Sequence, residues 1–373
     1  MNQITFQIPL ENLTRQYERI RAEVEPAVLQ VLASGKYILG PTVQAFEQEF
    51  AALCQTNYAL GISNGTEALH LALLACNIGA GDEVITVPNT YAATVFAITY
   101  TGATPVFVDV DSITFNMDIE QVKKKITPRT RAILPVHMYG QMVPMDALME
   151  VANQHGIWVI EDAAHAHGAE YQGKRAGSWG HIGCFSFYPT KVLGACGDGG
   201  AVTTNDPQLY DRLKVLRYMG QHVKYVNEIV GYQQRLDELQ AAILRVKLRY
   251  LDEWINARQR WAKLYSERLK GLPVITPQEV GEVRHTYYLY TIRAQHRDAL
   301  MAFLSQHGIS TAPIYPNLVP YQPAYQELGL KPGAFPVADA HLGEILCLPM
   351  FPELTEQEVV YVTDAIREFY HRR

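Results

Sequence analysis

EDAAHAHGAEYQGKRAGSWGHIGCFSFYPTKVLGACGDGG, residues 161–200, holds most of the features from which the fold and a binding site can be predicted. An apolar run, residues 157–160, precedes it and ends abruptly at Glu161 and Asp162. This pattern is typical of a buried parallel strand that carries a carboxylate at its C-terminal edge, where open α/β sheets bind ligands. Residues 184–188 then alternate like a second strand, and Lys191 follows a Pro-Thr break.

Lys191 is a candidate Schiff-base nucleophile. Apolar and aromatic neighbours desolvate a lysine, which lowers its pKa and frees the amine for reaction. Most lysines are solvated surface charges, so this position alone leaves a structural role open. The rest of the chain has to distinguish the two interpretations.

The composition is that of a globular enzyme. Hydrophobic residues make up 48% of the 373 residues and charged residues 19%, which fits one large domain and a smaller one. The formal net charge of −6 offers no basic surface for nucleic acid or an anionic membrane. We find no apolar run long enough for a transmembrane helix and no secretory signal pattern at the N-terminus.

The cysteines suggest a reducing compartment. They are odd in number and lack metal-ligand spacing, so we expect buried, reduced thiols in a cytoplasmic protein without a zinc or other metal site. The five are Cys54, Cys76, Cys184, Cys196 and Cys347.

The first two-thirds of the chain alternates short apolar strands with helical patterns. Predicted strands span residues 58–63, 83–88, 104–109, 132–137, 157–160, 184–188 and 199–204. Predicted helices span residues 20–32, 41–55, 67–76, 91–99, 118–126, 144–155 and 207–218. Strands that alternate with helices through short turns predict an α/β fold with a mostly parallel sheet and right-handed crossovers.

Polar and aromatic residues follow the predicted strands at their C-terminal ends. They are Asn64, Thr66, Asn89, Tyr91, His137, Tyr139, Glu161 and Asp162. Because these ends meet in one crevice, we expect a ligand site there. The Asn-Gly-Thr turn at 64–66 also opens a helix, whose free N–H groups and positive dipole end suit a phosphate. Simple capping of the helix is the other interpretation of this turn.

The last third predicts a second, smaller domain. A helical pattern runs from residue 235 to about residue 269 without Pro or Gly, and a helix of that length often bridges two domains. We therefore place a boundary near residue 250, between a large α/β domain (1–250) and a small α+β domain (251–373). The small domain should hold strands at 285–292 and 310–314 and helices at 297–307 and 356–370.

Imine chemistry at Lys191 needs an electron sink, and pyridoxal 5′-phosphate (PLP) is the usual one. PLP requires a lysine for its aldehyde, a carboxylate for its protonated pyridine nitrogen, N–H groups and hydroxyls for its phosphate, and a flat partner for its ring. In that order the candidates are Lys191, Asp162, Gly65 with Thr66 and Ser186, and Tyr91. Taken singly, Tyr91 and Ser186 could be ordinary packing residues. Their joint occurrence in this chain order favours a PLP site.

The motifs resemble, in order and spacing, those of the DegT-type nucleotide-sugar aminotransferases. They are SNGTEAL, NTY, HMYGQ, EDAAHAHGA, GCFSFYPTK, GDGGAV and RLDELQAA, and the resemblance covers nearly the whole chain. It implies PLP fold type I, the aspartate-aminotransferase-like fold. It also implies that Lys191 forms the imine with PLP, that Asp162 pairs with the pyridinium nitrogen, and that Tyr91 stacks on the ring.

The resemblance assigns further residues. Gly65, Thr66 and Ser186 would bind the phosphate. His165 would lie near the cofactor, with packing at a strand end as its alternative. Gln233 stands where relatives commonly carry an Asn that reaches the phosphate in the neighbouring subunit, so a homodimer with shared sites is implied.

The implied reaction moves an amino group from L-glutamate to a keto group of a nucleotide-linked sugar. The motifs look most like those of enzymes that aminate C3 of a dTDP-linked deoxy-keto-hexose, and amination at C4 is the alternative. Pro320 replaces a histidine that many relatives carry on the sugar side. Candidates for contacts with the sugar or nucleotide are Tyr188, Tyr218, His222 and Tyr315, and candidates for the diphosphate are Arg217, Lys224 and Arg235.

Two other classes of protein compete with this prediction. PLP-dependent sugar dehydratases share the architecture but carry a histidine in place of the imine-forming lysine, so Lys191 argues against that class. A doubly wound nucleotide-binding or regulatory protein without PLP is the second competitor. Neither a Gly-x-Gly-x-x-Gly turn after the first strand nor a Walker motif supports it.

Overall fold

The computed structural model describes residues 7–372. Residues 1–6, the start of the segment for which no secretory signal is expected, lie outside the described residues, as does residue 373. Within the described part of the chain, no helix is both long and apolar enough to cross a membrane.

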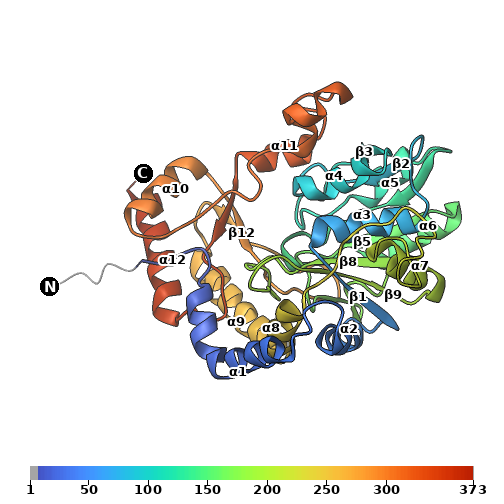
Figure 1. The fold of residues 1–373 in the computed structure, drawn as a ribbon. Coiled ribbons are helices and arrows are strands. Elements are labelled where there is room, and N and C mark those ends of the chain that lie inside the picture. The colour runs from blue at the N-terminus through green and yellow to red at the C-terminus, as the bar shows by residue number, and fades with distance from the viewer. Residues whose placement is uncertain (1–6, 373) are drawn as a thin grey trace.

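A seven-stranded sheet forms the centre of the larger part of the molecule (Figure 1). Its strands, in spatial order, are β1 (Tyr58–Ile62), β9 (Gly200–Thr204), β8 (Ile182–Ser186), β5 (Trp158–Asp162), β4 (Thr130–Ile133), β2 (Glu83–Thr86) and β3 (Thr104–Phe107). Only β9 runs antiparallel to its neighbours in this sheet. The expected α/β fold with a mostly parallel sheet is confirmed.

Helices cover both faces of this sheet, and strand β8 shows how the sequence decides their sides. Successive residues of a strand point to opposite faces. Cys184 donates from Sγ to the carbonyl of Ala68 in α3 at 3.5 Å, whereas Phe185 packs edge-on against Phe50 of α2 with ring centroids 4.9 Å apart. Helices α3 and α2 therefore lie on opposite faces of the sheet, as Figure 1 shows.

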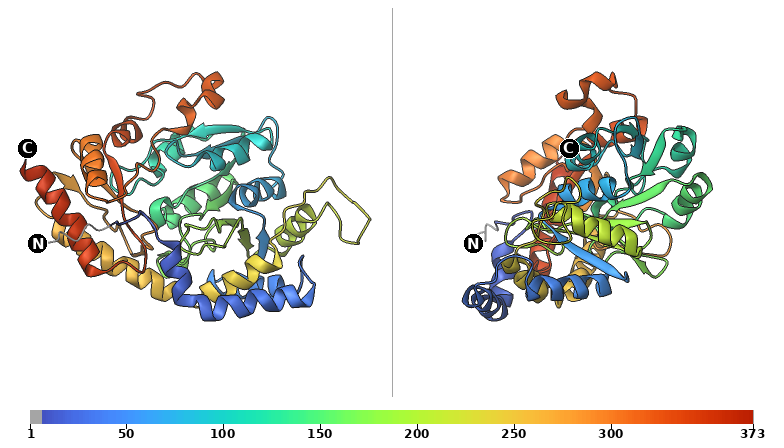
Figure 2. Two further views of the ribbon diagram at one scale, coloured as in Figure 1. Left: turned by 60° about the vertical axis from the view of Figure 1, so that its left-hand side comes forward. Right: turned by 45° about the vertical axis from the view of Figure 1, so that its right-hand side comes forward.

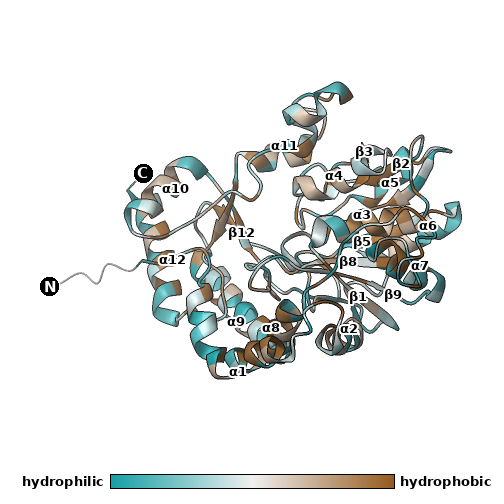
Figure 3. Ribbon diagram, viewed as in Figure 1, coloured by the Kyte–Doolittle hydropathy of each residue, from teal (hydrophilic) through white to brown (hydrophobic). Residues whose placement is uncertain are grey.

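The helices of this part alternate with the strands along the chain from β1 to β5. They are α1 (Leu13–Ser34), α2 (Pro41–Leu53), α3 (Gly65–Ala75), α4 (Ala92–Tyr100), α5 (Ile119–Lys125), α6 (Met145–His155), α7 (Pro207–Arg217) and α8 (Glu238–Leu248), with the 3-10 helix η1 at Met138–Gly140. Hydrophobic residues are frequent in α3 and α8, as the colouring of the ribbon shows (Figure 3). The segment between α7 and α8 extends away from the body of the molecule (Figure 2).

A second hydrophobic cluster forms where the chain continues beyond α8. It lies between helices α9 (Leu251–Leu269), α10 (Arg297–Gln306) and α12 (Glu356–His371) and the antiparallel sheet of β10 (Val274–Ile275), β12 (Tyr290–Ala294) and β13 (Ile345–Leu348). The remaining elements are β6 (Glu170–Tyr171), β7 (Lys174–Arg175), β11 (Val283–Arg284), η2 (Val319–Tyr321), η3 (Pro323–Leu328) and α11 (Pro336–Leu342). The domain boundary near residue 250 stays a prediction.

The single helix expected from residue 235 to about 269 is wrong, because α8 and α9 are separated at Arg249 and Tyr250. The two N–H groups there donate to carbonyls three residues back, at 3.2 and 3.0 Å, which tightens the turn. Both side chains also bond to Glu23 of α1. The break therefore depends on contacts with a distant helix, and neither Gly nor Pro marks it in the sequence.

The expected strand at 310–314 is also wrong, because this segment makes only an isolated bridge between Ala312 and Cys347. The strand expected at 285–292 begins later, at Tyr290. The residues before it bond elsewhere: the N–H of Thr286 donates to the carbonyl of Gly140 at 3.0 Å. Among the cysteines, Cys196 is exposed, contrary to expectation, because it lies in the glycine-rich loop after Lys191.

Candidate active site

A cavity of about 590 Å³ opens at the C-terminal ends of strands β1, β5 and β8. Nine of the side chains and backbone positions expected at the site line it: Gly65, Thr66, Tyr91, Asp162, His165, Ser186, Tyr188, Lys191 and Tyr315. The fold thus brings together residues that are separated by up to 250 positions in the sequence.

Asp162 ends strand β5 and is 4% exposed. Its Oδ2 atom accepts a hydrogen bond from the hydroxyl of Thr94 at 2.8 Å, and its Oδ1 atom accepts one from the N–H of Ala164 at 3.1 Å. Thr94 is itself bonded to the hydroxyl of Thr90 at 2.7 Å. Burial raises the pKa of Asp162, while these donors and the charge of Lys191 lower it. The carboxylate is therefore held rigidly and is stabilised further by a positive partner.

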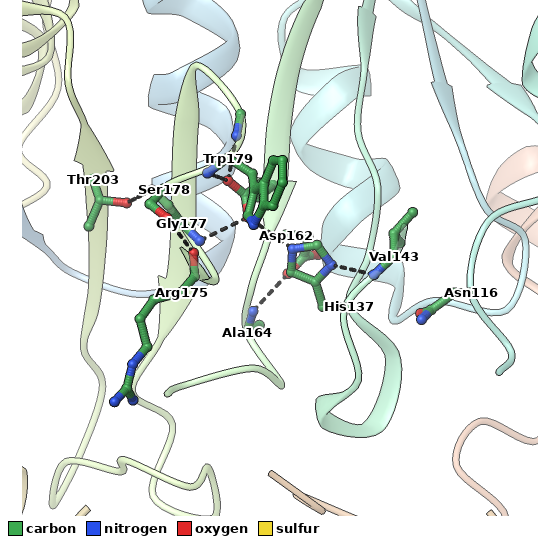
Figure 4. Close-up of polar contacts among 12 residues, drawn as sticks. Asn116, His137, Val143, Asp162, Ala164, Arg175, Gly177, Ser178, Trp179 and Thr203 are labelled. Carbon is green, nitrogen blue, oxygen red and sulfur yellow. Dashed lines mark hydrogen bonds and ion pairs between the residues drawn. The ribbon is translucent and has the colours of Figure 1, made fainter. Parts of the chain in front are cut away.

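The neighbouring Glu161 points to the opposite side of β5 and has a different task. It is fully buried and accepts hydrogen bonds from the N–H groups of Gly177 (2.8 Å), Trp179 (2.9 Å) and Gly180 (2.7 Å). The Nε2 atom of His137 lies 3.0 Å from its Oε2 atom. Figure 4 shows His137 on one side of the strand and the loop with Trp179 on the other. This network fixes the loop that leads into β8.

Lys191 lies beyond β8, in a turn where its N–H donates to the carbonyl of Tyr188 at 2.9 Å. Its Nζ atom is 4.5 Å from the centre of the Tyr288 ring. Burial lowers the pKa of Lys191 to about 8, against the opposing effect of the charges of Asp162 and Glu11. A substantial fraction of neutral amine is therefore present near neutral pH, as a nucleophile or proton acceptor requires.

The start of α3 and the end of β8 form one end of the cavity. A Cβ atom added at Gly65 would lie only 2.6 Å from the Cβ atom of Ser186, so the helix can approach the strand this closely only with glycine. The side chain of Asn64 caps the helix by accepting from the N–H of Glu67 at 2.9 Å. The first N–H groups of a helix have no partners within it, and Gly65 and Thr66 at this helix start line the cavity together with Ser186. Such an arrangement suits a phosphate.

Aromatic side chains and His165 line another part of the cavity. Tyr91 is 60% exposed, and its ring lies 5.4 Å from that of Tyr315. The Nδ1 atom of His165 accepts from the N–H of Tyr139 at 3.4 Å, so its Nε2 atom carries the proton and donates to the Tyr315 hydroxyl at 3.3 Å. Burial, with the charge of Lys191, holds the pKa of His165 well below its usual value. His165 is a neutral donor at neutral pH.

This arrangement meets the four requirements of PLP with groups of the right chemistry. A lysine with a lowered pKa, a buried carboxylate with room for another donor, a helix start for a phosphate and an open aromatic face all line the same cavity.

Comparisons with known proteins identify the chain. The sequence profile of the DegT/DnrJ/EryC1/StrS aminotransferase family matches residues 18–367. The chain belongs to this family. The expected family, fold type I, transaminase activity and PLP dependence are thereby confirmed, and solved structures of relatives include forms with PLP or its amine form, PMP.

Individual relatives of this aminotransferase match over nearly their full length. A protein of Geobacillus stearothermophilus named pleiotropic regulatory protein is 45% identical over 97% of this chain and 98% of its own. The dTDP-3-amino-3,4,6-trideoxy-alpha-D-glucose transaminase of Streptomyces venezuelae is 45% identical over 99% and 97%, respectively. The structure of S. venezuelae DesV in complex with a ketimine intermediate superposes with a TM-score of 0.96 at 45% identity, covering 98% of this chain and 99% of that one.

Three expected site residues of the aminotransferase lie away from the cavity within one chain. Gln233 is exposed and pairs with Tyr218 through an isolated bridge. His222 lies on the extended segment between α7 and α8, where its Nδ1 atom is 2.9 Å from Glu228. These placements leave their predicted roles untested by the geometry of a single chain.

The candidate diphosphate ligands also lie outside the cavity. Arg217 is buried and donates to the carbonyl of Gly61 at 2.8 Å and to Glu47, so it is used within the fold. Lys224 lies over the ring of Tyr225, and Arg235 lies over the ring of Tyr218.

Sequence reasoning missed two contributors to the site. Thr94 binds Asp162, and its spacing of four residues from Thr90 at a helix start could have indicated two hydroxyls on one face. Tyr288, whose ring lies next to the amine of Lys191, could not be found in this way, because the sequence predicted its segment to be part of a strand.

Proposed function

We propose that this aminotransferase transfers an amino group from L-glutamate to C3 of a dTDP-linked deoxy-keto-hexose, with PLP as cofactor. The observation that carries the proposal is the convergence of Lys191, Asp162 and the α3 start on one cavity. The C3 position is supported by the names of relatives at 43–45% identity, which are dTDP-3-amino-sugar transaminases. Amination at C4 is the alternative, and it is the less supported one.

We propose a role for each residue on the basis of its chemistry. Lys191 holds the cofactor covalently through Nζ, Asp162 pairs with its ring nitrogen, and Tyr91 stacks on its ring. Gly65, Thr66 and Ser186 bind its phosphate. When bound, PLP withdraws electrons from the carbon that bears the transferred amino group and so makes its proton acidic.

Lys191 then carries the proton. With the amino donor in its place, its Nζ atom would accept the proton from the donor's α carbon and deliver it to the cofactor carbon that Nζ had held. The lowered pKa of Lys191 supports this task, because the amine can exist in both protonation states near neutral pH. His165, as a neutral Nε2–H donor, orients Tyr315 in the same cavity.

We also propose that the enzyme is a cytoplasmic homodimer with shared sites. Among the described residues that line the cavity, Lys191 is the one lysine or arginine, yet a cofactor phosphate, a dicarboxylate and a sugar diphosphate all need donors. The exposed Gln233 and the extended segment beside it (Figure 2) could supply donors to a neighbouring chain. Tyr188, Tyr218, His222 and Tyr315 are the proposed contacts with the sugar nucleotide.

The test of the activity is incubation with L-glutamate and matched 3-keto and 4-keto dTDP-sugars, with the products read by mass spectrometry and NMR. The expected product is the 3-amino sugar, and a product aminated only at C4 would favour the alternative. Lys191→Ala should abolish turnover and remove the visible absorbance of the lysine-bound cofactor. An alanine variant with full activity would show that the assignment of Lys191 is wrong.

A further inference from the structure

Three charged side chains that are not among the residues lining the cavity, Glu11, Arg258 and Glu353, form a second polar group connected to the lysine turn. Glu11, in the segment before α1, interacts with the side chain of Thr190 and with the charges of Arg258 and Lys191. Its Oε2 atom is buried and has no hydrogen-bond partner among the described residues. Burial of a carboxylate oxygen without a hydrogen-bond partner costs free energy of folding. A functional role for this carboxylate would account for that cost.

Arg258 of α9 fixes this group in the fold. It is 4% exposed, and its Nη1 atom donates to the carbonyls of Tyr288 at 3.2 Å and Met350 at 2.8 Å. The N–H of Met350 in turn donates to the carbonyl of Leu10 at 3.1 Å. The guanidinium is thus anchored by backbone groups on both sides, and it holds the segment that carries Glu11 against the lysine turn.

The groups that face Glu11 come from several elements. From α9 comes Arg258, from the lysine turn Lys191 and Thr190, from the segment before β12 Tyr288, and from β13 Cys347. Beyond Arg258 lies Glu353, whose two carboxylate oxygens are also buried without partners among the described residues. Two acids and two bases therefore share this region.

Glu11 has two cationic neighbours, Arg258 and Lys191. Glu353 has Arg15 and Arg19 beside it as well as Arg258, and Lys191 has Asp162 as well as Glu11. When the Nζ atom of Lys191 becomes neutral, Glu11 keeps only Arg258, so its ionised form loses part of its stabilisation in a poorly solvated place and the carboxylate is more readily protonated. Of the two acids, Glu11 is the one that interacts directly with Lys191.

We propose that Glu11 is a positioning residue for Lys191: its carboxylate favours the lysine ammonium, and it takes up a proton from water more readily once Nζ is neutral. The step balances, because the proton that Nζ loses passes to the reacting carbon and the proton that Glu11 gains comes from water. This inference rests on the proposed role of Lys191 as proton carrier.

The titration ranges of the two groups agree with this coupling. Burial raises the pKa of Glu11 to about 7, although the charges of Arg258 and Lys191 oppose the rise. Burial lowers the pKa of Lys191 to about 8. Removal of the Glu11 charge takes away a group that favours the ammonium, so the pKa of Lys191 should fall further.

The test measures the titration of Lys191 directly in the full chain loaded with PMP, in which the lysine is not covalently bound. Trace acetic anhydride labels the neutral amine, and mass spectrometry of the Lys191 peptide gives its labelling midpoint as a function of pH. We expect a midpoint near 8 in the unchanged chain and one about one unit lower in Glu11→Gln, the order of shift that one neighbouring charge produces. Glu353→Gln is the matched control, a second buried acid beside Arg258, and should leave the midpoint in place.

Two outcomes would overturn the proposal: a folded Glu11→Gln variant with an unmoved midpoint, or an equal shift in Glu353→Gln. If Glu11→Gln does not fold, the coupling is measured from the other side. In protein labelled with carboxyl-¹³C glutamate, one resonance should titrate near pH 7, and its midpoint should rise in Lys191→Met. A midpoint that stays in place in this variant contradicts the coupling. Because neither readout depends on turnover, a failure here is distinct from a failure of the proposed reaction.

Discussion

Substitution of Gly65 by alanine tests the packing that brings the start of α3 to the end of β8. The added Cβ atom would lie 2.6 Å from Cβ and 3.2 Å from Cα of Ser186. Carbon atoms in contact prefer about 3.5–4.0 Å, so the helix start and the strand must separate by about 1 Å. Neither obstructing atom belongs to the far end of a flexible side chain, so a rotamer change cannot relieve the contact.

The cost follows from two opposed effects. Overpacking of this kind costs about 1–3 kcal/mol, while alanine gains up to about 1 kcal/mol over glycine within a helix. The fold should therefore survive. The loss should appear in cofactor binding, because a separation of about 1 Å breaks one charge-assisted hydrogen bond to the phosphate, worth about 1.5–3 kcal/mol. That corresponds to a PLP dissociation constant raised about 10- to 150-fold.

The assay is titration of the cofactor-free chain with PLP, followed by visible absorbance and compared with thermal unfolding. Gly343→Ala is the matched control, because its Cβ atom meets nothing within 4 Å and its backbone has φ −81°. The control should bind PLP with unchanged affinity. A Gly65→Ala variant that also binds PLP normally would refute the assignment of this helix start to the phosphate.

Two further predictions concern Asp162 and the partner chain. Thr94→Val removes the hydroxyl donor of Asp162, so the pKa of this carboxyl should rise further. PLP affinity should then fall several-fold, most strongly at acidic pH, where less of the ionised carboxylate remains. Thr94→Ser keeps the hydroxyl and should behave like the unchanged chain, and a Thr94→Val variant with an unaltered affinity–pH profile would contradict the role of this hydrogen bond. If Gln233 reaches the site of a neighbouring chain, sedimentation should find a dimer, and Gln233→Ala should weaken PLP binding while the dimer stays intact. An active monomer would count against shared sites.

The meeting of four predicted site positions in one cavity could be anticipated, because they lie at or shortly after strand ends. Lys191, Asp162, Ser186 and the turn at 64–66 follow from the rule that parallel strands present their carboxyl ends to one crevice. Their meeting in one cavity needs only the sheet order, and the alternation of strands and helices already implies a parallel sheet.

The parts that escaped prediction depend on contacts between distant segments. Tyr288 reaches Lys191 because the backbone before β12 bonds to Gly140 instead of continuing a strand. The break between α8 and α9 depends on Glu23, more than two hundred residues away. The helix and strand propensities of these residues do not indicate either contact, so the sequence pattern cannot predict them.

Hydrogen-bond capacity explains why Asp162, and not the adjacent Glu161, is the carboxylate available for catalysis. A carboxylate offers about four acceptor positions. Glu161 has all of them taken, by three backbone N–H groups and His137. Asp162 has two donors and lines the cavity, so it can accept a positively charged nitrogen there. The sequence indicates Asp162 as the candidate partner of the cofactor but offers no physical reason to exclude the adjacent Glu161. Strand alternation separates their faces, and the count of occupied acceptor positions then assigns one acid to the scaffold and the other to the site.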